Sequence, residues 1–253
     1  MFTSDEREQI RTALVIAARS DSRISGAAHL GSAALNSQDR WSDIDLGLSV
    51  LPDADLDEVI ADWTDRLYRQ YGAVTHCDVK RGTTLYRVFL LRNTLQVDIS
   101  FWLASDFRAI GPKFRLIFGQ ANQAQPAGSP TGSDLIGMAW LYALHVRSAI
   151  ARDRLLQAEY MLAGMRNETF ALACLRLGFS SVQGRGFDDL SDEQKSTFAA
   201  CYPASLQPVE LCRAFQETIG ALLIEIRHAD EELAKEIEDP LAEIATTTRS
   251  AIF

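Results

Sequence analysis

The sequence contains little of what marks several classes of protein. Only four of its 253 residues are cysteine and four are histidine, no two cysteines form a CxxC pair, and the histidines lack the spacing of metal ligands. This argues against a zinc site and a disulfide scaffold, and we expect the cysteines to be reduced thiols of the core. Lysine and arginine total 25 against 34 aspartates and glutamates, a formal net charge of -9. A chain without a basic surface is not expected to bind nucleic acid.

Long hydrophobic runs are missing near the N-terminus. The early apolar run at 13–18 is too short for a signal peptide or a membrane span, so we expect a cytoplasmic protein with no membrane partner. There is no internal repeat and no low-complexity tract. The composition is that of a globular protein, 47% hydrophobic and 23% charged, and the length allows one large domain or two smaller ones.

The first half of the chain alternates between predicted helices and strands. Helix formers fill 5–18, with Ser4 as the expected N-cap, and a short strand at 27–30 leads into a glycine turn. Apolar alternation predicts a strand over 44–50, and helical spacing predicts a helix over 56–71. The sequence therefore favours an α/β layer.

Three further strands are expected at 74–79, 85–91 and 95–101. The last two are separated by only three residues, which is short enough for a hairpin, so the sheet should be mixed. Residues 119–134 lack apolar periodicity and are rich in Gly, Pro, Ser, Ala and Gln, as in a linker.

Beyond this linker the apolar spacing is helical over 135–177 and 209–233, which predicts a bundle of four or five helices. The acidic segment 225–243 is expected to form a solvated outer helix face. The predicted fold is thus α+β, with a mixed-sheet domain at 1–118, a linker at 119–134 and a helical domain at 135–253.

Two aspartates flank one isoleucine at the start of the predicted strand 44–50. Residues at i and i+2 of a strand point to the same face, so Asp43 and Asp45 should lie side by side while Ile44 faces the other way. Neighbouring like charges are costly unless a cation lies between them, and oxygen ligands suit Mg²⁺. The Ser-Asp-x-Asp pattern also occurs in ordinary surface turns, so this pair alone does not decide between a metal site and a turn.

A third aspartate, Asp98, interrupts the apolar strand 95–101 and shares a face with Gln96 and Ser100. If this strand lies beside the strand of Asp43 and Asp45, three carboxylates converge on a patch able to hold two metal ions and to accept a proton from a hydroxyl. An earlier Gly-Ser pair would supply N–H groups and a hydroxyl to a triphosphate, although the pair alone is better explained as a tight turn.

The combination of Gly-Ser at 31–32, SDIDL at 42–46 and an aspartate in a later strand resembles the DNA polymerase β-like nucleotidyltransferase superfamily. The layout is most similar to its aminoglycoside and lincosamide nucleotidyltransferases. The resemblance implies that a nucleoside monophosphate, AMP from ATP, is transferred to a hydroxyl of a small antibiotic-like acceptor with release of pyrophosphate. Mg²⁺ would be the cofactor and ATP, or another nucleoside triphosphate, the co-substrate.

The resemblance also implies roles for particular residues. Asp43 and Asp45 would hold the metal that carries the triphosphate, and Asp98 would help to hold a second metal or act as the base. Gly31 and Ser32 would contact the terminal phosphates.

Family members often carry an arginine two residues beyond the Gly-Ser pair, but here that position is Ala34. The triphosphate charge must therefore be met elsewhere, with Arg40 as the first candidate and Lys113 and Arg115 as further ones. Without such a role, Lys113 and Arg115 would belong to a solvated basic loop after a segment that leads away from the sheet. Trp41 could stack on a base, but a tryptophan at a strand entry is more often a core anchor, which is our expectation.

Two other functions remain open. The chain could modify a protein, as toxin–antitoxin nucleotidyltransferases do, or it could bind a nucleotide without reacting. The base could be Asp98 or a glutamate of the helical half, Glu159 or Glu168. The acceptor and the preferred nucleotide do not follow from the sequence, which is also compatible with a homodimer.

Overall fold

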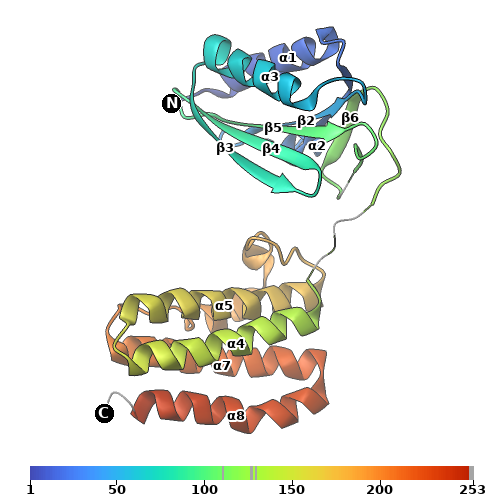
Figure 1. Cartoon of the computed structure of the whole chain (residues 1–253). Helices are drawn as coiled ribbons and strands as arrows, with labels where there is room; N and C mark the ends of the chain where they lie inside the picture. The colour runs from blue at the N-terminus through green and yellow to red at the C-terminus, as the bar shows by residue number, and fades with distance from the viewer. Residues whose placement is uncertain (110, 126–127, 129, 251–253) are drawn as a thin grey trace. The chain divides into compact units, whose positions relative to one another are not determined.

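The computed structural model describes residues 1–109, 111–125, 128 and 130–250. The chain divides into two compact units, Met1–Ala127 and Gly128–Phe253 (Figure 1). The first unit contains a six-stranded mixed sheet with helices, and the second is helical, which confirms the expected α+β class. None of the helices in these described ranges has both the length and the apolar character that a membrane crossing needs.

The first unit follows the predicted alternation of helices and strands. Its elements are α1 (Ser4–Ser20), β1 (Ile24–Leu30), α2 (Gly31–Ala34), β2 (Ile44–Val50), α3 (Leu56–Tyr71), β3 (Ala73–Arg81), β4 (Thr84–Leu91), β5 (Gln96–Leu103) and β6 (Phe114–Phe118). The strand order is β3-β4-β5-β2-β1-β6. Only the central pair β2/β5 is parallel; all other neighbours are antiparallel.

Helices α1 and α3 cover one face of the sheet (Figure 1). Leu14 of α1 and Trp63 of α3 pack in one cluster with Ile44 of β2 and Ile99 of β5. Burying a large apolar side chain contributes about 1.5–3 kcal/mol, and a slip of one residue would turn this whole set outward. The buried set therefore fixes which residues of β2 and β5 point to the other face.

Two predictions for the first unit are wrong. Helix α1 is capped by Thr3 and not by Ser4: Glu6 N–H donates to Thr3 Oγ1 (3.1 Å) and Thr3 N–H to a Glu6 carboxylate oxygen (2.7 Å), so one residue pair satisfies two free donors. Strand β6 was not expected at all. The basic segment around Arg115 returns to the sheet and pairs antiparallel with β1, instead of running away as a loop.

The second unit consists of α4 (Gly132–Ala151), α5 (Leu155–Leu177), the short 3₁₀ helix η1 (Phe187–Asp189), α6 (Asp192–Ala199), α7 (Pro208–Ala229) and α8 (Glu231–Ser250). Helix α4 begins inside the expected linker, because Thr131 and Asp134 form a capping box at its start. Long helices α4, α5, α7 and α8 share one apolar core.

The acidic segment 225–243 is not one outer helix face. The helical pattern breaks at Asp230, which lies between α7 and α8. Glu225 is buried and accepts two hydrogen bonds of 2.8 Å from the Arg176 guanidinium of α5. Its position in α7 faces a neighbouring helix and not solvent, which the charge pattern alone did not indicate.

Candidate active site

The parallel pairing of β2 and β5 brings three carboxylates together. Asp45 lies opposite Asp98 in the register, and Asp43 precedes Asp45 by two residues. One carboxylate oxygen from each of the three lies within 4.8 Å of the others, and all three side chains are half-buried. Three hard oxygen donors this close could hold a divalent cation. Mg²⁺ takes such oxygen ligands and keeps positions for water and phosphate.

These aspartates are held in place by their apolar neighbours. Ile44 and Leu46 of β2, and Val97 and Ile99 of β5, are fully or almost fully buried on the face covered by α1 and α3. Since side chains alternate along a strand, the intervening aspartates must point to the other face.

Gln96 also contacts the triad. From the sequence it was expected only to share a strand face with Asp98. Its Nε2 donates to Asp98 Oδ1 (3.0 Å) and to Asp43 Oδ2 (3.3 Å), so one amide group bridges two carboxylates of the triad. Its place two residues before Asp98 was the available signal. The bridge offsets part of the repulsion between the two acids.

The pKa of Asp98 is raised to about 6 by burial of its carboxyl group. The hydrogen bond from Gln96 acts in the opposite direction, and the charge of Asp43 raises the pKa further. Asp98 is therefore mostly ionised at pH 7 and able to bind a cation. A pKa near the working pH also suits a group that accepts a proton.

Gly31 is required by the close approach of Asp45. Its φ is +58°, and a Cβ at this position would lie 1.9 Å from Asp45 Oδ2. Only glycine tolerates both the left-handed backbone and this contact. Gly31 thus allows the first turn of α2 to lie against the triad.

Ser32 follows Gly31 in α2, where its carbonyl accepts hydrogen bonds from the N–H groups of Leu35 (3.2 Å) and Ser37 (3.1 Å). Helix α2 is only four residues long. Few peptide dipoles add up in one turn, so a helix dipole contributes little to anion binding here. Any phosphate contact would depend on local N–H groups and the Ser32 hydroxyl.

Arg40 and Trp41 lie in the turn at 39–42 that precedes β2. The Arg40 guanidinium lies 4.5 Å from the centre of the Trp41 ring, and both side chains are exposed. The prediction that Trp41 anchors the core is wrong, because β2 begins three residues later at Ile44 and Trp41 belongs to the turn. Arg115 of β6 donates to Asn36 Oδ1 (2.9 Å), which brings this cation to the loop after α2, while Lys113 is exposed beside β6.

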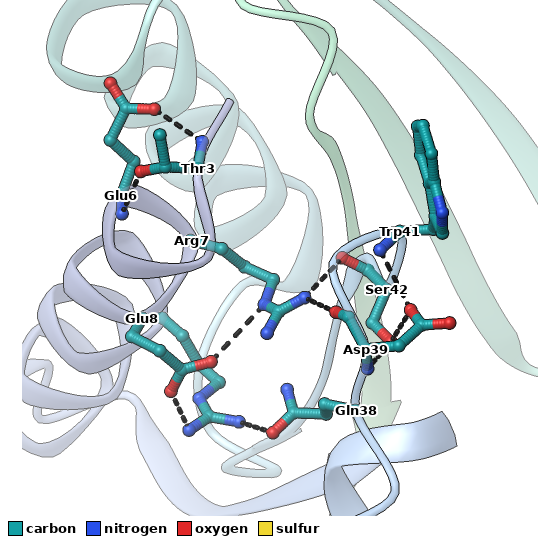
Figure 2. A network of polar contacts seen from close by, with 9 residues as sticks. Thr3, Glu6, Arg7, Glu8, Gln38, Asp39, Trp41 and Ser42 are labelled. Atoms are coloured by element: carbon teal, nitrogen blue, oxygen red, sulfur yellow. Dashed lines mark hydrogen bonds and ion pairs between the residues drawn. The ribbon is translucent and has the colours of Figure 1, made fainter. Parts of the chain in front are cut away.

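Arg7 of α1 donates hydrogen bonds to the backbone of this turn, as Figure 2 shows. The side chain is only 4% exposed, and its Nη1 donates to the carbonyl oxygens of Asp39 and of Ser42, the latter at 3.1 Å. Next to it, Arg11 donates to Gln38 Oε1 at 2.8 Å. Arg7 therefore fixes the backbone immediately before Asp43. The sequence did not indicate this residue, because its partners lie more than thirty positions away.

No family model and no curated protein sequence matches the chain. Among solved structures it is similar to an aminoglycoside 6-adenyltransferase from Bacillus subtilis, with a TM-score of 0.42 and 14% sequence identity over 94% of this chain and 98% of that one. This similarity is too weak to assign that protein's activity to the chain. The functional proposal below therefore rests on the residues of the site.

The two candidate bases of the helical half have different surroundings. Glu159 accepts a hydrogen bond from Arg166 Nη2 (3.3 Å), so its charge is already compensated. Glu168 lines a cavity of about 400 Å³ together with Asn167 and Phe187, and burial raises the pKa of its carboxyl group. Glu168 therefore combines access to a cavity with a raised pKa.

Proposed function

We propose that the chain is a metal-dependent nucleotidyltransferase that transfers a nucleoside monophosphate, AMP from ATP, to a hydroxyl of a small acceptor and releases pyrophosphate. One observation carries the proposal: carboxylate oxygens of Asp43, Asp45 and Asp98 lie within 4.8 Å of one another on adjacent parallel strands. Such a cluster is costly without a cation and suits the magnesium of a bound triphosphate.

In this proposal Asp43 and Asp45 hold the cation that accompanies the triphosphate. The bound cation would neutralise charge that develops on the phosphate oxygens. Asp98 either holds a second cation or accepts the proton of the attacking hydroxyl, and its raised pKa of about 6 suits the role of proton acceptor. Glu168 is the alternative base, since burial also raises the pKa of its carboxyl group.

The phosphates would be contacted by the Ser32 hydroxyl and by main-chain N–H groups near Gly31. Arg40 and Arg115 are two cations near this region, because Arg40 lies three residues before Asp43 and Arg115 contacts the loop after α2; Lys113, exposed beside β6, is a third candidate. These cations would compensate for the lack of an arginine at position 34, which is Ala34 in this chain. The acceptor in this proposal is a small hydroxylated molecule.

Isothermal titration with ATP tests the proposal. Wild type should bind ATP only when Mg²⁺ is present, and Asp43→Asn should weaken binding by at least about tenfold, since one ligand of the cation loses its charge. Asp53→Asn is the matched control, because Asp53 is an exposed aspartate beyond the opposite end of β2. Equal MgATP affinity in Asp43→Asn and wild type would contradict the proposal.

Turnover is then measured as pyrophosphate release with a panel of hydroxylated small molecules. Release that depends on one acceptor and is lost in Asp98→Asn supports the proposed reaction. An AMP-sized mass increase on a copurifying protein, with no release on any small molecule, would assign the acceptor to the protein class instead. Tight MgATP binding with neither result would identify a nucleotide-binding protein without transferase activity.

A further inference from the structure

Trp41 is the most exposed of the four tryptophans in the chain. Its side chain is 64% exposed, against 1% for Trp63, 5% for Trp102 and 39% for Trp140. An indole ring in water forgoes the burial that normally stabilises a tryptophan. Burial in a core therefore does not account for a tryptophan at this position.

The turn that carries Trp41 is held rigidly (Figure 2). Asp39 Oδ1 accepts hydrogen bonds from the Trp41 N–H (2.8 Å) and the Ser42 hydroxyl (3.0 Å), and Asp39 N–H donates to Ser42 Oγ (2.9 Å). Arg7 adds its two bonds to the carbonyls of Asp39 and Ser42. A ligand that contacts Trp41 would therefore pay little entropy to order the backbone.

The Trp41 ring points away from α1. Figure 2 shows the Trp41 ring on the opposite side of the turn from Arg7 and α1. Asp43, Asp45 and Asp98 also lie on the face that α1 does not cover. Trp41 is two residues from Asp43, so their Cα atoms are at most about 7 Å apart. This is the distance scale between the phosphates and the base of one nucleotide.

We propose that Trp41, with Arg40 against one face of its ring, is the platform on which the nucleobase of the bound nucleotide stacks. The proposal rests on the proposed function, because it assumes that the triad holds the triphosphate. Arg40 lies 4.5 Å from the ring centre, which leaves the other face of the indole for the base. Stacking depends on the size of the π-face and not on base edges, so ATP should bind more tightly than CTP.

Titrations with two probes separate contact to the base from contact to the phosphates. The probes are MgATP and magnesium tripolyphosphate, which has no base. Trp41→Ala should weaken MgATP binding by about tenfold or more and reduce the preference for ATP over CTP, while tripolyphosphate binding falls by far less, through the loss of the ring on which Arg40 packs. Trp41→Phe should keep most of the MgATP affinity, because it retains an aromatic face. Trp140→Ala, the other tryptophan with substantial exposure, is the matched control and should bind as wild type does.

Three results would overturn the proposal, and they are distinguishable. Unchanged MgATP affinity in Trp41→Ala, with wild type binding MgATP well, removes the stacking role and leaves the proposed function intact. An equal loss for MgATP and tripolyphosphate would show that Trp41 acts on the shape of the turn and not on the base. Failure of wild type to bind either probe would overturn the proposed function and the stacking platform together.

Discussion

Burial and cation binding favour different protonation states of the Asp98 carboxyl group. Burial raises its pKa to about 6 from an ordinary value of 3.8, so the ionised form is less favourable in the folded protein than in the unfolded chain. Cation binding requires the ionised form. Keeping Asp98 ionised at neutral pH therefore costs stability, as is common for residues that serve a site and not the fold.

Asp98→Asn should stabilise the metal-free protein by about 1–3 kcal/mol at pH 7.5, because the cost of the buried charge is removed. This cost is fully present above the folded pKa of about 6 and disappears as the pH falls toward the unfolded pKa of 3.8. The gain should therefore shrink between pH 6 and pH 4. Denaturant unfolding of both proteins at several pH values measures it. A gain that grows as the pH falls would contradict the account.

Gly31→Ala should abolish MgATP binding, because the added Cβ would displace the Asp45 carboxylate that it meets at 1.9 Å. Gly82→Ala is a matched control. Gly82 has nearly the same φ, +59°, but no heavy atom within 4 Å of an added Cβ. Both variants should lose roughly 1 kcal/mol or more of folding stability, because alanine disfavours the left-handed backbone. Only Gly31→Ala should also lose MgATP binding. Titration calorimetry and thermal melting separate the effects, and normal binding by Gly31→Ala would refute the role of the contact.

Among the elements, α1 has two functions. Its apolar face, including Leu14, packs on the sheet, and Arg7 near its start holds the turn that precedes Asp43. A helix buried in the core is a rigid support for a turn at the site. The geometry of Asp43 is thus set partly by a helix that lies on the other face of the sheet.

Arg7→Met should loosen the turn at 39–42, since two backbone carbonyls lose their donor. Hydrogen exchange of the Trp41 N–H, which donates to Asp39, should become at least about tenfold faster, and MgATP affinity should fall by several-fold. Arg19→Met is the control, because Arg19 also lies on α1 but donates to a carbonyl of β6. Exchange of the Trp41 N–H at the wild-type rate would show that the turn is stable without Arg7.

Elements with a strong local pattern were predicted closely from the sequence. The bounds of β2 and α3 agree with the prediction, because alternation ends at Leu51-Pro52 and α3 is capped after Tyr71 by Gly72, whose φ is +71°. Strand β6 was missed because it is a short edge strand whose polar Arg115 breaks the pattern.

Features that depend on distant partners could not be predicted. The burial of Arg7 depends on carbonyls of residues 39 and 42, and that of Glu225 on Arg176, which is 49 positions earlier. For the triad, the sequence predicted that strand alternation places Asp43 and Asp45 on one face. That their strand neighbours the strand of Asp98 was only a hypothesis, because strand order depends on how the whole sheet packs.

At the scale of the whole molecule, each unit has its own apolar core. The triad, Gly31 and the 39–42 turn all belong to the first unit, and the Glu168 cavity belongs to the second. The proposed nucleotide site therefore lies within the first unit.

A chain that ends at residue 127 should therefore bind MgATP within a few-fold of the full chain. Circular dichroism establishes that the shortened chain is folded before titration. A folded fragment that does not bind MgATP would show that the nucleotide site needs residues from the second unit.

The central claim is that the three aspartates bind divalent cations beside a triphosphate. The most direct measurement is a crystal structure of the chain with Mn²⁺ and a nonhydrolysable ATP analogue, in which anomalous scattering locates the metal. The account predicts a peak ligated by oxygens of Asp43 and Asp45 and by the phosphates, with Asp98 beside it. A nucleotide bound elsewhere, or a metal that none of the three contacts, would contradict it.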